Sequence, residues 1–277
     1  MKNQLIIRTA LLLLLIPFLM GTTTAQKKIR LKYNLKSGAN YSYNISMDQE
    51  ISFSANGQDI ALNQEMTMKM TSVVTKENDD YKITSSLDAI TMKQSIFGME
   101  IFYNSEDSAT FTSGMGKKLG DELNKLIGKS YSVTIDPLGN VKDIDMGSLD
   151  ESGDISENLN RSTVYAVFPD HKVAVGESWE VETVPMIDSS MILNTKYTLK
   201  KVKGKKAVIA FEITITSSEK SESKLNGTQK GELILNRKTG WTIHSTVDQE
   251  LNMEINTNGM SMPATLSGTT EVDSKKK

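Results

Sequence analysis

The stretch that decides the fold is Tyr41-Ser42-Tyr43-Asn44-Ile45-Ser46-Met47-Asp48-Gln49-Glu50-Ile51-Ser52-Phe53. Its odd-numbered positions are apolar or aromatic except for Gln49, and its even-numbered positions carry Ser, Asn, Asp and Glu. A repeat of two residues is typical of a β-strand with one buried face and one wet face. The stretch therefore predicts a long strand in an antiparallel sheet that is solvated on one side.

The same alternation returns along the chain at Met66, Met68 and Met70, at Ile209 to Ile215, and from Trp241 to Ile255. Polar stretches near residues 56, 78 and 203 stand between such runs and read as turns. Two segments, Lys117–Ile127 and Ile155–Ala166, have a helical pattern. The sequence predicts a mainly β protein, an antiparallel curved sheet or open half-barrel with one or two short helices.

The composition limits the chemistry of this protein. The 277 residues are 38% hydrophobic and 24% charged, with a formal net charge of −2 and no cysteine. Without cysteine the chain forms no disulfide, thiolate metal site or cysteine nucleophile. Its charge balance lacks the basic excess of a nucleic-acid-binding domain, so no nucleic-acid partner is expected.

The first 25 residues read as a signal peptide. Lys2 and Arg8 provide a positive start, a short apolar run ends at Met20, and small residues lead to a cleavage site after Ala25. The apolar run is shorter than the roughly 20 residues that a transmembrane anchor needs, and no cysteine follows it for lipidation. We therefore expect an exported, non-lipidated protein, located in the periplasm or outside the cell.

Residues 26–277 are predicted to form one β-rich domain made of two related halves, about 29–145 and 168–273. Gly38 and Tyr41 open the first half as Gly176 and Trp179 open the second, and glycine turns at 139 and 240 also correspond. Residues 146–167 would form an acidic crossover between the halves. The alternative is that the halves are unrelated units of strand, turn and strand.

Candidate chemistry is sparse. The two histidines, His171 and His244, lie in different halves, and no nucleophile elbow, metalloprotease helix or phosphate-binding loop is present. Asp143-x-Asp145 begins like a calcium loop, but Ser148 replaces the required glycine. We expect no catalytic residue, no metal site and no cofactor, and hence no enzyme.

Methionine is abundant, and three methionines alternate along one strand face. Methionine adapts to irregular gaps, so ordinary core filling is one interpretation. A second is an apolar concavity for a lipid or for an apolar segment of a partner, and a third, less favoured, is a thioether site for copper. The candidate ligand-binding residues are Ile45, Met47, Met66, Met68, Met70, Trp179 and Trp241.

Three sequence features resemble an uncharacterised family of secreted bacterial proteins, a domain of unknown function. These are the Gly38/Tyr41 start, the segment Phe168-Pro169 to Ser178-Trp179, and the turn Asn236-x-x-x-Gly240-Trp241. The resemblance would cover nearly the whole mature chain, and it implies no activity or catalytic residue.

A looser similarity, in strand arrangement only, is to periplasmic lipoprotein carriers and mycobacterial lipid-binding lipoproteins. That similarity implies an incomplete barrel whose apolar concavity, covered by helices, holds acyl chains. The chain departs from it in lacking the lipidation cysteine and in its low helical content.

These observations favour a non-enzymatic exported protein that binds an apolar ligand, a lipid or acyl chain, or an apolar partner segment, in a β concavity. The alternative is a structural or adhesive envelope protein that binds a protein partner through sheet edges or loops. A carrier requires an apolar cavity, whereas a scaffold should be packed solid.

Overall fold

A computed structural model describes residues 27–55, 58–111, 114–148, 165–186, 191–217, 225–257 and 260–277. Within these ranges the chain forms one twelve-stranded sheet. Its strands are β1 (Asn40–Ala55), β2 (Gln58–Glu77), β3 (Asp80–Ile96), β4 (Met99–Asn104), β5 (Ser130–Ile135), β6 (Val141–Asp145), β7 (Ser178–Thr183), β8 (Met191–Lys203), β9 (Lys206–Ser217), β10 (Leu225–Asn236), β11 (Thr242–Thr257) and β12 (Met260–Lys276). A 3₁₀ turn, η1 (Ser108–Phe111), and one helix, α2 (Gly114–Leu123), lie between β4 and β5.

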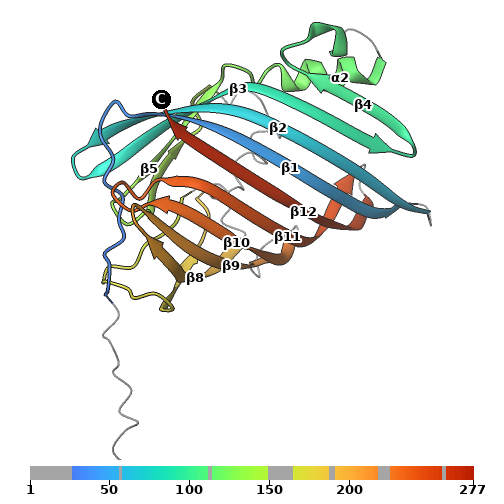
Figure 1. Cartoon of the computed structure of the whole chain (residues 1–277). Helices are drawn as coiled ribbons and strands as arrows, with labels where there is room; N and C mark the ends of the chain where they lie inside the picture. The colour runs from blue at the N-terminus through green and yellow to red at the C-terminus, as the bar shows by residue number, and fades with distance from the viewer. Residues whose placement is uncertain are drawn as a thin grey trace, which may run out of the picture.

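The strand order is β6-β5-β3-β2-β1-β12-β11-β10-β9-β8-β7, antiparallel throughout, and β4 pairs with β3 outside this path. The sheet does not close into a barrel, so the prediction of a mainly β protein with a curved, open antiparallel sheet is confirmed. The first six strands and the last six meet where β1 pairs with β12, in the middle of the sheet (Figure 1). The relation between the two halves stays a prediction.

The two-residue alternation explains which face of the sheet is buried. Ile45 of β1 lies opposite Met68 of β2 and Val272 of β12, and all three side chains are buried. On β9, the predicted apolar set from Ile209 to Ile215 is buried on the same face. We call this the inner face, and the face with Ser, Asp, Glu and Lys the outer face.

An N-terminal strap, residues 29–35, covers one end of the inner face. Ile29 exchanges backbone hydrogen bonds of 2.8 and 2.9 Å with Val173, and the backbone N–H of Tyr33 donates to the carbonyl of Pro137 at 2.7 Å. Leu31, Tyr33 and Leu35 point into the core, and the residues between them are exposed. The strap lies beside the first residues of β1, so it closes the end of the sheet that contains the C-terminus (Figure 1).

Glycines on the inner face allow neighbouring strands to approach closely. A Cβ at Gly268 of β12 would lie 2.3 Å from the backbone oxygen of Asp48 on β1, and one at Gly231 of β10 would lie 1.9 Å from that of Thr246 on β11. Real side chains do not fit at these distances. Glycines at such positions let a sheet bend sharply, which suits the concave inner face seen here.

Some local predictions need correction. The predicted helix Lys117–Ile127 is displaced: α2 spans Gly114–Leu123, and turns follow it up to residue 128. Ile243 does not continue the alternation from Trp241, because the β10–β11 register shifts there and pairs Leu235 with Thr242 and Ile234 with His244. The signal peptide, and residues 155–164 of the second predicted helix, lie outside the described residues.

If glycine at position 268 permits the bend, Gly268→Ala should destabilise the protein, since the new methyl group meets backbone atoms of β1 that cannot move independently. We expect a loss of about 1–3 kcal/mol in the free energy of unfolding, the usual cost of overpacking. Guanidinium denaturation measures it. The control is Ser267→Ala, at the neighbouring exposed position, and equal stability of both variants would refute this role of Gly268.

Candidate functional site

A row of glutamines crosses the inner face and divides it into two regions. The pairing register aligns Gln94, Gln64 and Gln49 of β3, β2 and β1 with Gln249 and Gln229 of β11 and β10, and Gly268 stands in the middle. Nε2 of Gln94 donates to Oε1 of Gln64 at 2.7 Å, and Nε2 of Gln229 donates to Oε1 of Gln249 at 3.1 Å. We call this set the glutamine row.

The predicted methionine residues lie between the glutamine row and the strap. Ile45 and Met68 are only 3% and 2% exposed, and both belong to the core. Met47, Met66 and Met70 share their face and are half-buried, packed against that core. The structure therefore brings the five candidates together, but on the closed side of the sheet. Their role in ligand binding stays a prediction.

The two tryptophans are also core residues of the closed side. Trp241 stacks on Tyr41, with ring centroids 3.8 Å apart, and its Nε1–H donates to Oγ of Ser274 at 3.0 Å. Trp179 stacks on Tyr197 and donates to the carbonyl of Val167 at 2.8 Å. Both indoles have satisfied hydrogen bonds and aromatic partners, so they stabilise the wall of the sheet.

On the side of the glutamine row away from the strap, the inner face remains apolar, but its side chains are less buried than those on the strap side. Ala264 is buried there, but the larger side chains around it on β1, β2, β11 and β12 are half-buried: Ile51, Phe53, Ile60, Leu62, Leu251, Met253 and Leu266. In the described part of the chain, the side chains that pack against the core include Leu251 and Met253 but not Ile51, Leu62 or Leu266. We call these seven residues the open-side surface. It lies at the right-hand end of the strands in Figure 1.

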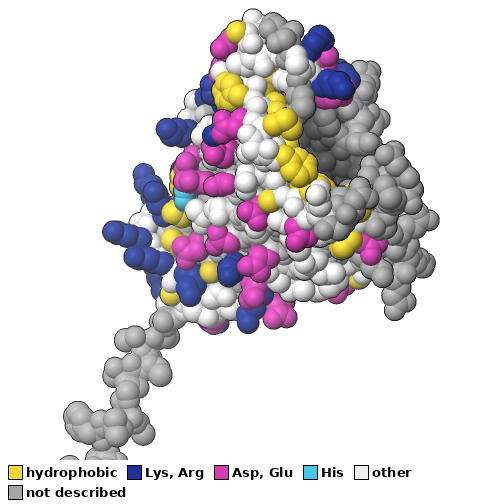
Figure 2. All heavy atoms as spheres, turned by 90° about the vertical axis from the view of Figure 1, so that its right-hand side faces the viewer, with side chains coloured by type: hydrophobic (Ala, Val, Ile, Leu, Met, Phe, Trp, Pro, Cys, Tyr) yellow, Lys and Arg dark blue, Asp and Glu magenta, His cyan; other side chains and the backbone are white. Residues whose placement is uncertain are grey.

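Figure 2 views the molecule from this end and shows hydrophobic side chains gathered in a band on it. Leaving a large aliphatic side chain exposed to water forgoes up to roughly 1.5–3 kcal/mol of burial free energy. Since the pairing register places these seven side chains side by side across β2, β1, β12 and β11, they form one apolar surface rather than scattered residues. Ile51 and Phe53 of this surface belong to the alternating stretch from Tyr41 to Phe53. Alternation alone does not show that they are half-buried while Tyr43 and Ile45 are buried.

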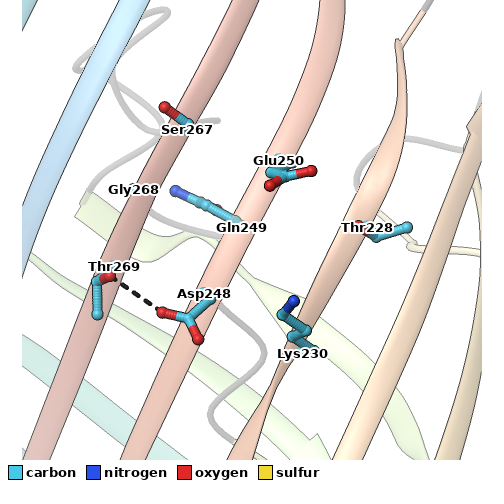
Figure 3. Close-up of a pocket in the computed structure, with 8 residues that line it drawn as sticks. All are labelled: Thr228, Lys230, Asp248, Gln249, Glu250, Ser267, Gly268 and Thr269. Atoms are coloured by element: carbon cyan, nitrogen blue, oxygen red, sulfur yellow. Dashed lines mark hydrogen bonds between the residues drawn. The ribbon is translucent and has the colours of Figure 1, made fainter.

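The outer face has a shallow polar pocket of about 300 Å³ over β10, β11 and β12 (Figure 3). Its floor is formed by Gln249 and Gly268, and Oγ1 of Thr269 donates to Asp248 at 3.1 Å across its edge. A second, open pocket of about 320 Å³ has a mixed lining, with apolar Phe53, Met253, Pro263 and Ala264 beside Ser52, Ser54, Asp59, Asn252 and Thr265. Neither outer pocket offers an enclosed apolar site.

The histidines do not form one site. His171 lies 3.1 Å from the carboxylate of Asp170 in an exposed turn. His244 lies on the outer face, with Nδ1 3.0 Å from Asp273 and 3.8 Å from Glu271. These last three residues could together offer ligand atoms to a metal ion, an arrangement that their positions in the sequence did not reveal. Their carboxylates are exposed, so the geometry alone does not make a metal site.

Buried tyrosines surround the closed end of the inner face. The hydroxyl of Tyr33 donates to the carbonyl of Ala166 at 3.2 Å. Burial raises the pKa of Tyr33 and Tyr43 well above the ordinary value, and the nearby phenol of Tyr165 adds to both shifts. Burial also raises the pKa of Tyr197. These phenols are therefore neutral at physiological pH, and the hydroxyl of Tyr197 accepts a hydrogen bond from the backbone N–H of Val167 at 3.5 Å.

Comparison with known proteins finds a similarity to an uncharacterised family over part of the chain. Residues 148–242 match a family described as "Family of unknown function (DUF6263)". The match contains the Phe168–Trp179 segment and the turn at Gly240, so the predicted resemblance to a domain of unknown function is confirmed over this part. No curated protein matches the chain.

Among solved structures, the chain is similar to one titled "Lipid-protein interactions in lipovitellin", with a TM-score of 0.59 and 9% identity. The alignment covers 87% of this chain and 25% of that one, so the chain spans about a quarter of its length. At this identity the similarity shows a shared fold alone.

Two further similarities have scores too low to support a shared fold. The translocator domain of the autotransporter NalP from Neisseria meningitidis has a TM-score of 0.26 at 6% identity, covering 87% of this chain and 89% of that one. An outer membrane channel from Pseudomonas putida F1 has a TM-score of 0.23 at 9% identity, covering 88% and 97%. In the described ranges, no helix is both long enough and apolar enough to cross a bilayer.

The tyrosines predict alkaline unfolding. Because their folded-state pKa lies above the unfolded value of about 10, their contribution to stability is complete below that pH and is lost as the pH rises past it. The free energy of unfolding should therefore not change through Tyr33, Tyr43 and Tyr197 between pH 7 and 9. At higher pH the absorbance of their tyrosinate forms should appear only when the circular dichroism of the folded chain is lost. Ionisation of all eight tyrosines near pH 10 in a chain that stays folded would contradict this.

Proposed function

We propose that the protein is an exported, non-enzymatic carrier that binds the acyl chain of a lipid on its open-side surface. The observation that carries the proposal is the division of the inner face. On β1, β2 and β12 the packed core ends at the glutamine row, and beyond it half-buried Ile51, Leu62 and Leu266 form an apolar surface outside that core. On β9 and β10 the core continues past the row, with Ile215 and Leu225. Lipid-binding concavities are lined in this way, mainly by apolar side chains with a few polar groups that fix orientation.

The glutamine row supplies those polar groups. Its amides carry both donors and acceptors at the inner end of the apolar surface, and Gly268 stands between Gln49 and Gln249, where its lack of a side chain lets Gln49 pack closely. A carboxyl, ester or amide group of a lipid would find hydrogen-bond partners there, and its chain would extend toward the open end. An amphiphile therefore fits this arrangement better than a pure hydrocarbon.

The fold comparison supports the same proposal. The structure with which this chain shares its fold is described by its title as one of lipid–protein interactions. The predicted signal peptide supports export, and the absence of a recognised catalytic motif in the sequence supports a binding role.

A structural protein that recruits a partner by strand addition is the second candidate, and the two end strands of the main strand order, β6 and β7, argue against it. β6 has five residues and carries Lys142, Asp143 and Asp145, and β7 has six and carries Glu180 and Glu182. Short, charged edge strands are a common means of preventing edge-to-edge pairing.

The test measures binding of a fluorescently labelled palmitate by the purified chain and by Leu62→Trp. Leu62 lies between Ile51 and Ile96 in the pairing register, so an indole there fills the open-side surface. We expect at least about a tenfold loss of affinity, equivalent to roughly 1.4 kcal/mol.

The control is Asn63→Trp, which puts the same indole at the neighbouring, exposed position of β2. It should bind the palmitate probe as the unchanged protein does. Equal affinities of all three proteins, or no binding by the unchanged chain, would contradict the proposed site.

A further inference from the structure

The hairpin between β3 and β4 ends in an unusual turn. Ile96 pairs with Met99, so Phe97 and Gly98 form a two-residue loop. Their φ angles are +52° and +74°, both in the left-handed region. Positive φ at both central positions defines a type I′ turn, for which Asn-Gly is the preferred sequence. A bulky aromatic residue such as Phe97 is strained in this region.

The other short hairpins of the chain use residues suited to such turns. Asn78 takes φ +56° between β2 and β3, and Gly204 takes φ +55° between β8 and β9. The sequence between β1 and β2, and between β11 and β12, is Asn-Gly. Phenylalanine at position 97 is thus an exception that the fold does not require.

The exposed apolar side chains of this hairpin lie at its turn and on both faces, although its outer face also carries Ser95, Glu100 and Lys93. Phe97 is 65% exposed, Met99 52% and Phe102 49%. Met99 lies on the inner face, opposite Ile96, and Phe102 lies on the outer face, opposite Lys93. Half of the six large hydrophobic side chains that are exposed in the described residues therefore belong to one hairpin. Figure 1 shows this hairpin at the same end of the molecule as the open-side surface.

The tip of the hairpin is also uncharged. Residues 94–99 contain no acidic or basic side chain, and the nearest charges, Lys93 and Glu100, neutralise each other at 3.3 Å. A protein partner would need to bury one face of the hairpin. The exposed apolar side chains of this hairpin instead point in three directions, Phe97 at the turn, Met99 on the inner face and Phe102 on the outer face, and a fluid apolar medium that surrounds the tip can contact all three.

We propose that the Phe97–Met99 tip inserts into the surface of a lipid bilayer. The inference rests on the proposed function: Met99, Ile96 and Leu62 are successive cross-strand neighbours, so an apolar path leads from the tip to the open-side surface. In the described residues β4 pairs only with β3, and its unpaired edge limits insertion to the turn and its flanking side chains. Insertion of the tip thus brings the open-side surface close to the membrane, so that the acyl chain of a membrane lipid can move onto this surface.

The experiment measures co-sedimentation of the full mature chain with phosphatidylcholine vesicles, for the unchanged protein and for Phe97→Asn. Asparagine suits the turn, so the variant should remain folded, with a Tm raised by roughly 2–4 °C. Its partition into vesicles should fall about tenfold, because it loses the aromatic side chain that enters the bilayer. The control is Asn78→Gly, at the β2–β3 turn at the other end of the sheet, which should sediment with vesicles as before.

Binding of the labelled palmitate without vesicles separates the two proposals. Phe97→Asn should keep this binding, since Phe97 lies outside the open-side surface. If Phe97→Asn bound vesicles as well as the unchanged protein does, or if the unchanged protein bound no vesicles, the membrane inference would be overturned and the carrier proposal would stay intact. Vesicle binding without palmitate binding would overturn the carrier proposal alone. A dimer that Phe97→Asn dissociates in the absence of vesicles would show that the tip contacts a second copy instead.

Discussion

The structure depends on one constraint: a single sheet has to bury the apolar face that its two-residue alternation creates. In the described residues no second sheet packs on that face. The sheet instead bends around it, where Gly231 and Gly268 let neighbouring strands approach closely, and the strap at Leu31, Tyr33 and Leu35 closes one end. Burial is therefore complete near the strap and partial at the opposite end.

This gradient of burial links the fold to the proposed function. On the closed side, stacked aromatic rings and Met68 belong to the buried core, and Met47, Met66 and Met70 pack against it. Past the glutamine row, the same strands continue with Ile, Leu and Phe side chains that stay half-buried. An apolar chain placed there would complete the core without changing the backbone. The strained tip at Phe97 lies at that same end, so the surface that would hold the ligand and the hairpin that would meet the membrane are neighbours.

The fold class followed from the sequence because alternation is a local signal. Tyr41 to Phe53, Met66 to Met70 and Ile209 to Ile215 lie in strands with the predicted face buried. Two features could not be predicted, because they depend on pairing between distant strands. Register joins Gln49, Gln64 and Gln249 into one row, and it brings His244 beside Glu271 and Asp273. The alternation in a single strand also does not show which of its apolar residues the strap covers. The sequence alone therefore did not separate Met68 and Trp241, which are core residues, from the half-buried residues of the open-side surface.

The most direct test of the carrier proposal is native mass spectrometry of the mature chain, residues 26–277, purified from its own envelope without detergent. The account predicts a discrete added mass that disappears on organic extraction and identifies the class of the bound lipid. A clean ligand-free mass, with no uptake when lipid is added back, would contradict it and would leave the open-side surface to a protein partner.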